Sequence, residues 1–158
     1  MAKAISNATV LIFLAKLNRF DLLWKRYDEI FIPSKVREEI LSKEDPVLKE
    51  VIERFKIKDP KKKRDLNLGS GETDSILLCK EERISDFLSD DKRARSVARI
   101  LKINTIGTLG ILLWNLQKGY LTKQECKDLV EQLMRNHYYI STSLYATTLK
   151  LIEEKAKK

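Results

Sequence analysis

The residues of this sequence best suited to chemistry are acids placed just after apolar segments or near the starts of amphipathic ones. Carboxylate and carbonyl oxygens are the ligands that Mg²⁺ and Mn²⁺ prefer, and such ions can activate water for attack at phosphorus. Surface acids are common, so the same pattern also fits a solvated surface. The candidates are Glu38, Glu39, Glu72, Asp74, Asp90 and Asp91, together with the amide of Asn7.

Helix geometry narrows the choice among neighbouring acids. On a helix, Glu72 and Asp74 lie about 200° apart, so both cannot point at one ion. Asp74 shares the apolar face of its predicted helix, whereas Glu72 is free to cap the helix or stay solvated. Glu38 and Glu39 diverge by about 100°, and Glu39 lies nearer the apolar stripe. We therefore expect Asp74 and Glu39 to face the site.

Positive charge is concentrated in two stretches, and the rest of the chain is close to neutral, with a net of −1 against the formal net charge of +8 for the whole chain. Residues 56–65 hold six basic and two acidic residues, a net of +4, and residues 92–102 hold five basic residues and no acid. Such concentration favours a polyanionic partner, although solvated loops and helix faces also carry charge runs. The candidate RNA contacts are Lys62 and Lys63 in the first stretch and Lys92, Arg95 and Arg99, which share one face, in the second. We find no exposed-aromatic pattern typical of a base-stacking platform.

The elements that must position these residues alternate along the chain. Short apolar segments predict strands at 2–6, 29–32, 84–88 and 103–106, with amphipathic helices between them. This order predicts a three-layer α/β fold, with a largely parallel sheet of four or five strands covered by helices on both faces. Ligands of open α/β sheets bind beyond the carboxyl ends of the strands. We therefore expect the acids to gather at that edge.

A single domain is expected over residues 1–158, with helices over 122–157 as a C-terminal extension. Ser34 is a predicted helix cap, and Thr122 to Glu125 matches a capping box. Asp90 or Asp91 could likewise be nothing more than a cap for the helix that starts at Lys92.

Composition places the chain among proteins of the cytoplasm. The longest apolar run, Val10 to Ala15, is too short to span a bilayer, and the N-terminus has no signal-peptide pattern. Cys79 and Cys126 have no metal-ligand spacing and are expected to be buried thiols in a reducing compartment. The lone histidine, His137, is expected to be part of loop structure. We expect no membrane association.

Five segments in order resemble the motifs of PIN domains, in particular the archaeal and bacterial branch related to toxin ribonucleases of toxin–antitoxin pairs. These segments are Ile5 to Lys16, Ile32 to Ile40, Gly69 to Leu78, Leu88 to Arg95 and Ile106 to Gly110. The likeness covers roughly residues 1–115. No single motif is specific for this family, but the five in order together are persuasive evidence of the resemblance.

The resemblance implies a set of site residues. Those at the family's metal and catalytic positions are Asn7, Glu39, Asp74 and Asp90. The neighbouring acids Glu72 and Asp91 are implied as further metal ligands, and Thr108 as a hydroxyl residue that faces the site.

Asn7 departs from the family pattern, which usually has Asp at this position. An amide oxygen can ligate a hard cation, but it brings no negative charge and cannot act as a base, so metal affinity should fall. Alternatively, Asn7 is a turn or helix-cap residue after the first strand.

The resemblance implies a Mg²⁺- or Mn²⁺-dependent endoribonuclease that cleaves RNA by metal-activated water. It also implies a toxin held by a small antitoxin protein, and we expect a homodimer. The alternative is a catalytically weakened PIN-like module that binds RNA or a protein. Asn7 favours this alternative, whereas Glu39, Asp74 and Asp90 favour the enzyme.

Overall fold

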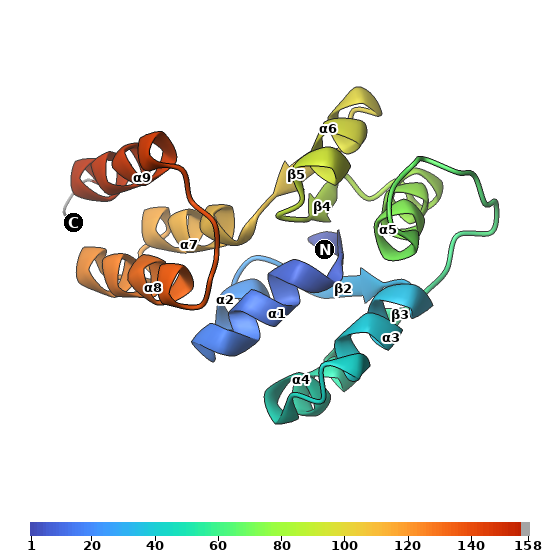
Figure 1. Ribbon diagram of the computed structural model, residues 1–158, viewed down its shortest axis with the longest axis horizontal. Helices are drawn as coiled ribbons and strands as arrows, with labels where there is room; N and C mark the ends of the chain where they lie inside the picture. Colours follow the sequence, from blue (N-terminus) through green and yellow to red (C-terminus); the bar gives the residue numbers. More distant parts are fainter. Residues whose placement is uncertain (156–158) are drawn as a thin grey trace.

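Five short parallel strands form one sheet in the computed structural model, which describes residues 1–155 (Figure 1). The strand order is β3-β2-β1-β4-β5, and every pair in this order is parallel. The strands are β1 (Lys3–Ser6), β2 (Glu29–Ile32), β3 (Lys56–Ile57), β4 (Asp86–Leu88) and β5 (Asn104–Ile106). The predicted α/β class and parallel sheet are confirmed. The fifth strand, β3, lies at the start of the basic stretch 56–65.

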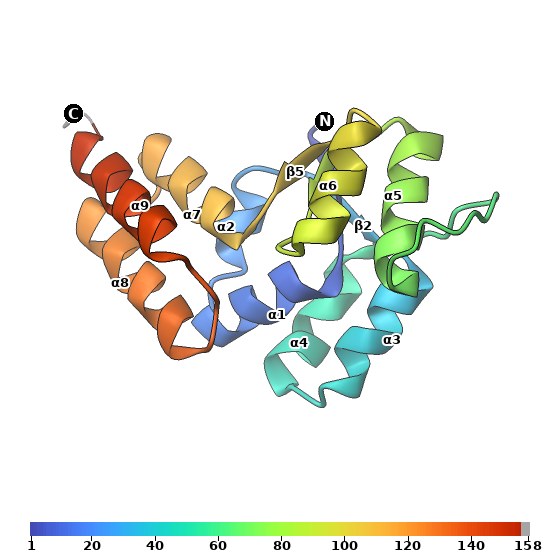
Figure 2. The same ribbon diagram turned by 45° about the horizontal axis from the view of Figure 1, so that its top comes forward.

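Helices cover both faces of the sheet, as Figures 1 and 2 show. The helices are α1 (Ala8–Leu17), α2 (Asp21–Trp24), α3 (Ser34–Ser42), α4 (Pro46–Val51), η1 (Ile52–Arg54), α5 (Ser70–Glu82), α6 (Lys92–Ile100), α7 (Thr108–Gln117), α8 (Lys123–Arg135) and α9 (Thr142–Glu154). Helices α5 and α6 pack on one face, whereas α1 and α7 pack on the other, where α8 and α9 add an outer pair beside α7. Residues 156 and 157, which close the predicted extension, lie outside the described residues.

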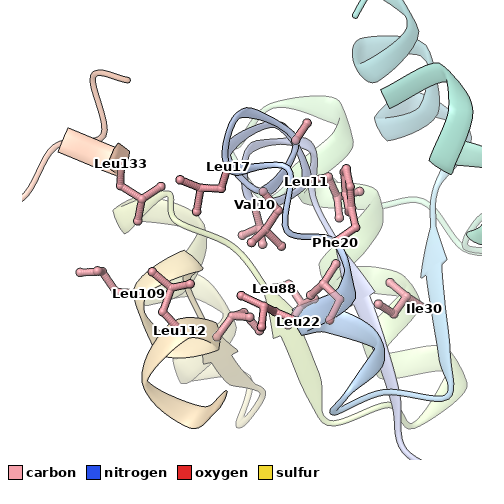
Figure 3. Packing of buried hydrophobic residues seen from close by; sticks show 14 of the residues in the cluster. Val10, Leu11, Leu17, Phe20, Leu22, Ile30, Leu88, Leu109, Leu112 and Leu133 are labelled. Atoms are coloured by element: carbon pink, nitrogen blue, oxygen red, sulfur yellow. The ribbon is translucent and has the colours of Figure 1, made fainter. Parts of the chain in front are cut away.

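The alternation of side chains along each strand divides the core between the two faces. In β1, Ala4 joins the core under α1 and α7, whereas Ile5 joins the core under α5 and α6. In β4, Leu88 and Phe87 divide in the same way. Figure 3 shows Leu88 beneath the leucines and valine of α1, with Leu112 of α7 beside it. Each large side chain buried in this way contributes about 1.5–3 kcal/mol to folding.

Backbone hydrogen bonds hold the carboxyl ends of β1, β4 and β5 side by side. The amide of Asn7 donates to the carbonyl of Leu88 at 3.0 Å. The amide of Ser89 donates in turn to the carbonyl of Ile106, also at 3.0 Å. The residues that directly follow these three strands therefore meet at one edge of the sheet.

Two predicted helix caps have different outcomes. The Thr122 hydroxyl accepts from the amide of Glu125, whose carboxylate accepts from the amide of Thr122, so the capping box is confirmed. The prediction for Ser34 is wrong, because Ser34 is the first residue of α3 and its amide and hydroxyl both donate to Asp59. Within residues 1–155, no helix combines the length and the apolar character needed to cross a membrane.

Candidate functional site

A cavity of about 500 Å³ opens at the carboxyl edge of the sheet. It lies between the starts of α1 and α5 and the middle of α3, and we call it the acidic cavity. Its polar side chains come from Asn7, Thr9, Lys35, Glu38, Glu39, Ser42, Ser70 and Glu72. Three of the predicted site residues, Asn7, Glu39 and Glu72, are therefore brought together from three different elements.

Asn7 is held at the junction of β1 and β4 by its amide group. Its Nδ2 donates to the Ser89 hydroxyl at 2.7 Å, and its Oδ1 accepts from the Thr9 hydroxyl at 3.0 Å. The residue occupies the N-cap position of α1, yet its side chain makes no capping hydrogen bond. With 3% of its surface exposed, Asn7 is nearly buried. The side chain therefore links the two strand ends rather than capping the helix.

Glu72 lies in the first turn of α5, close to two other carboxylates. Burial raises the pKa of Glu72, and the negative charges of Asp91 and Glu39 raise that pKa further. Gly71 brings α5 against α3, because a Cβ at this position would lie 3.2 Å from Cγ2 of Val36. This close helix contact sets Glu72 across the cavity from the exposed Glu39. The cavity is therefore lined by three carboxylates, those of Glu38, Glu39 and Glu72, together with the cation of Lys35.

Asp74 does not line the acidic cavity, although we expected it to face the site. Its nearly buried carboxylate accepts a hydrogen bond from the Lys63 ammonium at 3.0 Å. Helix α5 begins at Ser70, which turns Glu72 toward α3 and leaves Asp74 beneath the basic loop that carries Lys63. The structure therefore reverses the expected orientation of the two acids. A role for Asp74 as a metal ligand stays a prediction.

The Asp90 carboxylate is engaged by three donors. Its Oδ1 accepts from the Thr108 amide at 2.8 Å and from the Tyr138 hydroxyl at 2.7 Å, and its Oδ2 accepts from the Thr108 hydroxyl at 2.6 Å. Burial raises the pKa of Tyr138, and the nearby Asp90 charge raises it further. Thr108 thus lies beside a predicted site acid. Sequence reasoning missed Tyr138, which lies 48 positions from Asp90 and belongs to no motif.

Asp91 caps α6, as one reading of the sequence proposed. One of its carboxylate oxygens accepts from the amide of Ala94 at 2.8 Å. Asp91 does not line the acidic cavity, although its charge acts on Glu72, so its role as a metal ligand stays a prediction. Asp90 makes no cap, since its hydrogen bonds reach α7 and the connection between α8 and α9.

A second cavity, of about 750 Å³, lies between α6, α7 and α9, and Asp90 lines this cavity rather than the acidic one. We call it the basic cavity. Its cationic wall consists of Arg26, Lys92, Arg95 and Arg99. The three predicted RNA contacts of α6 therefore share one surface. Lys62 and Lys63 line neither cavity: the Lys62 amide donates to Glu81, and the Lys63 ammonium binds Asp74.

The donor types of the acidic cavity suit a hard divalent cation. The cavity presents the carboxylates of Glu38, Glu39 and Glu72 and the amide oxygen of Asn7, which are oxygen ligands of the kind that Mg²⁺ and Mn²⁺ take. Asp91 lies outside this lining, although its charge acts on Glu72. Within residues 1–155, however, no three His, Cys, Asp or Glu side chains already surround one ion position. The cavity therefore fits a divalent cation by the types and charges of its side chains rather than by a preformed coordination geometry.

Comparison with known proteins shows the family and the fold of this chain. A family model described as a PIN domain matches residues 3–154. A solved PilT N-terminus domain protein from the hyperthermophilic archaeon Sulfolobus solfataricus P2 shares the fold, with a TM-score of 0.56 and 20% sequence identity over 73% of this chain and 94% of that one. No curated protein matches this sequence. The resemblance read from the five motifs is confirmed: the chain belongs to the PIN domain family, whose members are generally nucleases.

Proposed function

We propose that this chain is a Mg²⁺- or Mn²⁺-dependent endoribonuclease that hydrolyses phosphodiester bonds at the acidic cavity. The observation that carries the proposal is the meeting of Glu39, Glu72 and Asn7 in one cavity at the carboxyl edge of a PIN-domain sheet. The raised pKa of Glu72 supports it, because burial and the negative charges of Asp91 and Glu39 disfavour the charged carboxylate, and a bound cation would offset this cost.

Each residue of the site has a role in this proposal. When bound, a divalent ion would supply an activated water and positive charge at the phosphate. Glu39, Glu72 and Asp91 would hold that ion, with the Asn7 oxygen as a neutral ligand. The cations of α6 would bind the RNA backbone beside the cut.

A second candidate is a PIN module that binds RNA without cleaving it. Two observations favour it: Asn7 stands where the family usually has Asp, and three hydrogen bonds already engage the Asp90 carboxylate. The antitoxin partner and the homodimer expected from the resemblance stay predictions.

RNA cleavage by the purified full chain distinguishes the two candidates. A 5′-labelled single-stranded RNA is incubated with the protein in Mn²⁺ or in EDTA, and the products are separated by length. We expect cleavage that requires Mn²⁺ and falls by about 100-fold or more in Glu39→Gln and in Glu72→Gln. Glu131→Gln is the matched control, since Glu131 lies on α8 and pairs with Arg135.

Cleavage that survives in both cavity variants would contradict the proposal. RNA binding by a folded protein that never cuts, in any divalent ion, would establish the binding module instead.

A further inference from the structure

The basic cavity combines positive charge with exposed aromatic and apolar surface. Lys92, Arg95 and Arg99 form the wall on α6, whereas Leu144 and Leu151 form the wall on α9, where they are 45% and 42% exposed. Tyr139 lines the same cavity and is 76% exposed. A cavity with one cationic wall and one apolar wall is suited to a ligand that has an anionic part and a flat apolar part.

Aromatic rings in this cavity already lie close to cations. The Lys92 ammonium lies 5.9 Å from the centre of the Tyr139 ring, and the Arg26 guanidinium lies 5.1 Å from that of Trp114. Rings beside cations are the pattern that proteins use to stack the bases of unpaired strands while binding their phosphates. The sequence did not reveal it, because Tyr139 is separated by almost forty positions from the basic helix it faces.

We infer that the basic cavity binds an unpaired nucleotide of a single-stranded nucleic acid. The phosphates lie along Lys92, Arg95 and Arg99, and the base lies against Tyr139 and the leucines of α9. The volume of about 750 Å³ is within the range of small-ligand sites and leaves room for one nucleotide and part of its neighbour. This inference rests on the proposed function for the identity of the strand, which is the RNA substrate.

The position of the cavity fits a substrate subsite. Asp90 lines the basic cavity, and the next residue, Asp91, influences Glu72 in the acidic cavity. One strand could therefore place a nucleotide in the basic cavity while an adjacent phosphate lies at the acids. Helix α9 and the connection before it, which lie outside the five motifs, would then select which nucleotide stands beside the cut.

Charge and shape favour a nucleotide over the other ligand that a basic, partly apolar groove could take, an acidic helix of a partner protein. On α9, Leu144 and Leu151 share a face with Thr147 and Thr148, which lie between them and also line the cavity, so α9 presents no continuous apolar stripe to a partner helix. A duplex is disfavoured too, since its bases are paired and cannot stack on Tyr139.

Fluorescence anisotropy of the full chain with a labelled oligonucleotide tests the inference. The probe is a fluorescein-labelled single-stranded RNA of about 12 nucleotides, a length typical of the strands that single-strand binding sites cover. The buffer contains EDTA so that no cleavage occurs. We expect Tyr139→Ala to weaken binding about tenfold. We expect Arg99→Gln to weaken it about fivefold and to reduce the salt slope by about 1. Arg135→Gln, an equal charge change on an exposed residue of α8, should change binding less than about twofold.

Each outcome bears on this inference separately from the nuclease proposal. Tyr139→Ala and Arg99→Gln that bind like Arg135→Gln would overturn it, as would equal affinity for the annealed duplex. Selective loss in the two variants, in a protein that never cleaves RNA, would support the cavity as a binding site while the proposed hydrolysis fails. Cleavage by the parent with unchanged binding in the variants would overturn this inference alone.

Discussion

The hydroxyl of Tyr138, on the connection between α8 and α9, donates a hydrogen bond of 2.7 Å to Asp90 Oδ1 at the end of β4. The ring of Tyr138 also packs edge-on against Phe13 of α1, with the ring centres 4.9 Å apart. The C-terminal helices are therefore attached to the sheet edge at one of the predicted site acids. Loss of this bond would affect both the stability of the extension and the position of Asp90.

Tyr138→Phe removes the hydroxyl and keeps the ring that packs on Phe13. We expect the free energy of unfolding to fall by about 1–3 kcal/mol, because a hydrogen bond to a charged, partly buried carboxylate is lost. Urea denaturation at neutral pH measures this change. Tyr139→Phe is the control, since Tyr139 is largely exposed and should tolerate the same deletion. Equal stability of the two variants would show that the Tyr138–Asp90 bond contributes nothing to folding.

Glu72→Gln should stabilise the protein at pH 7. The pKa of Glu72 is raised in the folded state, so folding favours its protonated form. The stability that protonated Glu72 contributes is present in full below the ordinary pKa of a glutamate, and it is lost as the pH rises through the raised pKa. At pH 7 the charged carboxylate therefore carries a cost that glutamine removes. We expect a gain of less than about 1 kcal/mol at pH 7, and a smaller one near pH 4.

Urea denaturation of Glu72→Gln and its parent at pH 7 and near pH 4 tests whether the substitution raises the free energy of unfolding. Glu131→Gln, a change on the exposed surface of α8, should show no such gain. A destabilised Glu72→Gln at pH 7 would mean that Glu72 is held by favourable contacts rather than crowded by Asp91 and Glu39.

Asn7→Asp restores the usual family residue. We expect tighter Mn²⁺ binding, because a carboxylate adds negative charge to the site. Without metal, we expect the free energy of unfolding to fall by about 1–3 kcal/mol, because the new charge is nearly buried. The Ser89 hydroxyl can rotate to donate to the new carboxylate, so the strand junction is kept.

Calorimetry with Mn²⁺ and urea denaturation measure the two effects of Asn7→Asp. Asn104→Asp, at the opposite end of the sheet in β5, should leave Mn²⁺ affinity unchanged. An unchanged affinity in Asn7→Asp as well would remove Asn7 from the set of ligands.

Gly107→Ala should disturb the Asp90 network directly. A Cβ at this position would lie 2.7 Å from Asp90 Oδ1 and 2.9 Å from Arg95 Nη1, and both contacts are too short. We expect a loss of about 1–3 kcal/mol in the free energy of unfolding, as for other overpacked sites. Gly69→Ala, whose Cβ would meet its nearest atom at 3.6 Å, is the control and should be nearly neutral. Equal thermal unfolding of both variants would show that Asp90 and Arg95 can move apart freely.

The sheet and its carboxyl edge could be predicted from the sequence because both follow from local patterns. Apolar segments separated by amphipathic helices fix a parallel sheet, and the residues just after each segment must then share one edge. Asn7 and Asp90 are placed in this way, from the ends of β1 and β4. Glu39 follows from its position on α3 beside the apolar stripe of Val36 and Ile40.

The orientation of the acids on α5 could not be predicted in this way. The angle of about 200° correctly implied that Glu72 and Asp74 point in different directions. Which of them faces the site depends on where α5 begins and on Lys63, which reaches Asp74 from a loop eleven positions earlier. Tyr138 and Tyr139 were missed for a similar reason: each meets its partner through contacts between segments far apart in the sequence.

Titration of the full chain with Mn²⁺ by calorimetry tests the central claim, that the acidic cavity is a metal site, most directly. We predict saturable binding that weakens about tenfold or more in Glu72→Gln and in Glu39→Gln, and less in Asp74→Asn, whose carboxylate is engaged by Lys63. Absence of saturable binding in a folded protein, or equal affinity in Glu72→Gln and its parent, would contradict the claim.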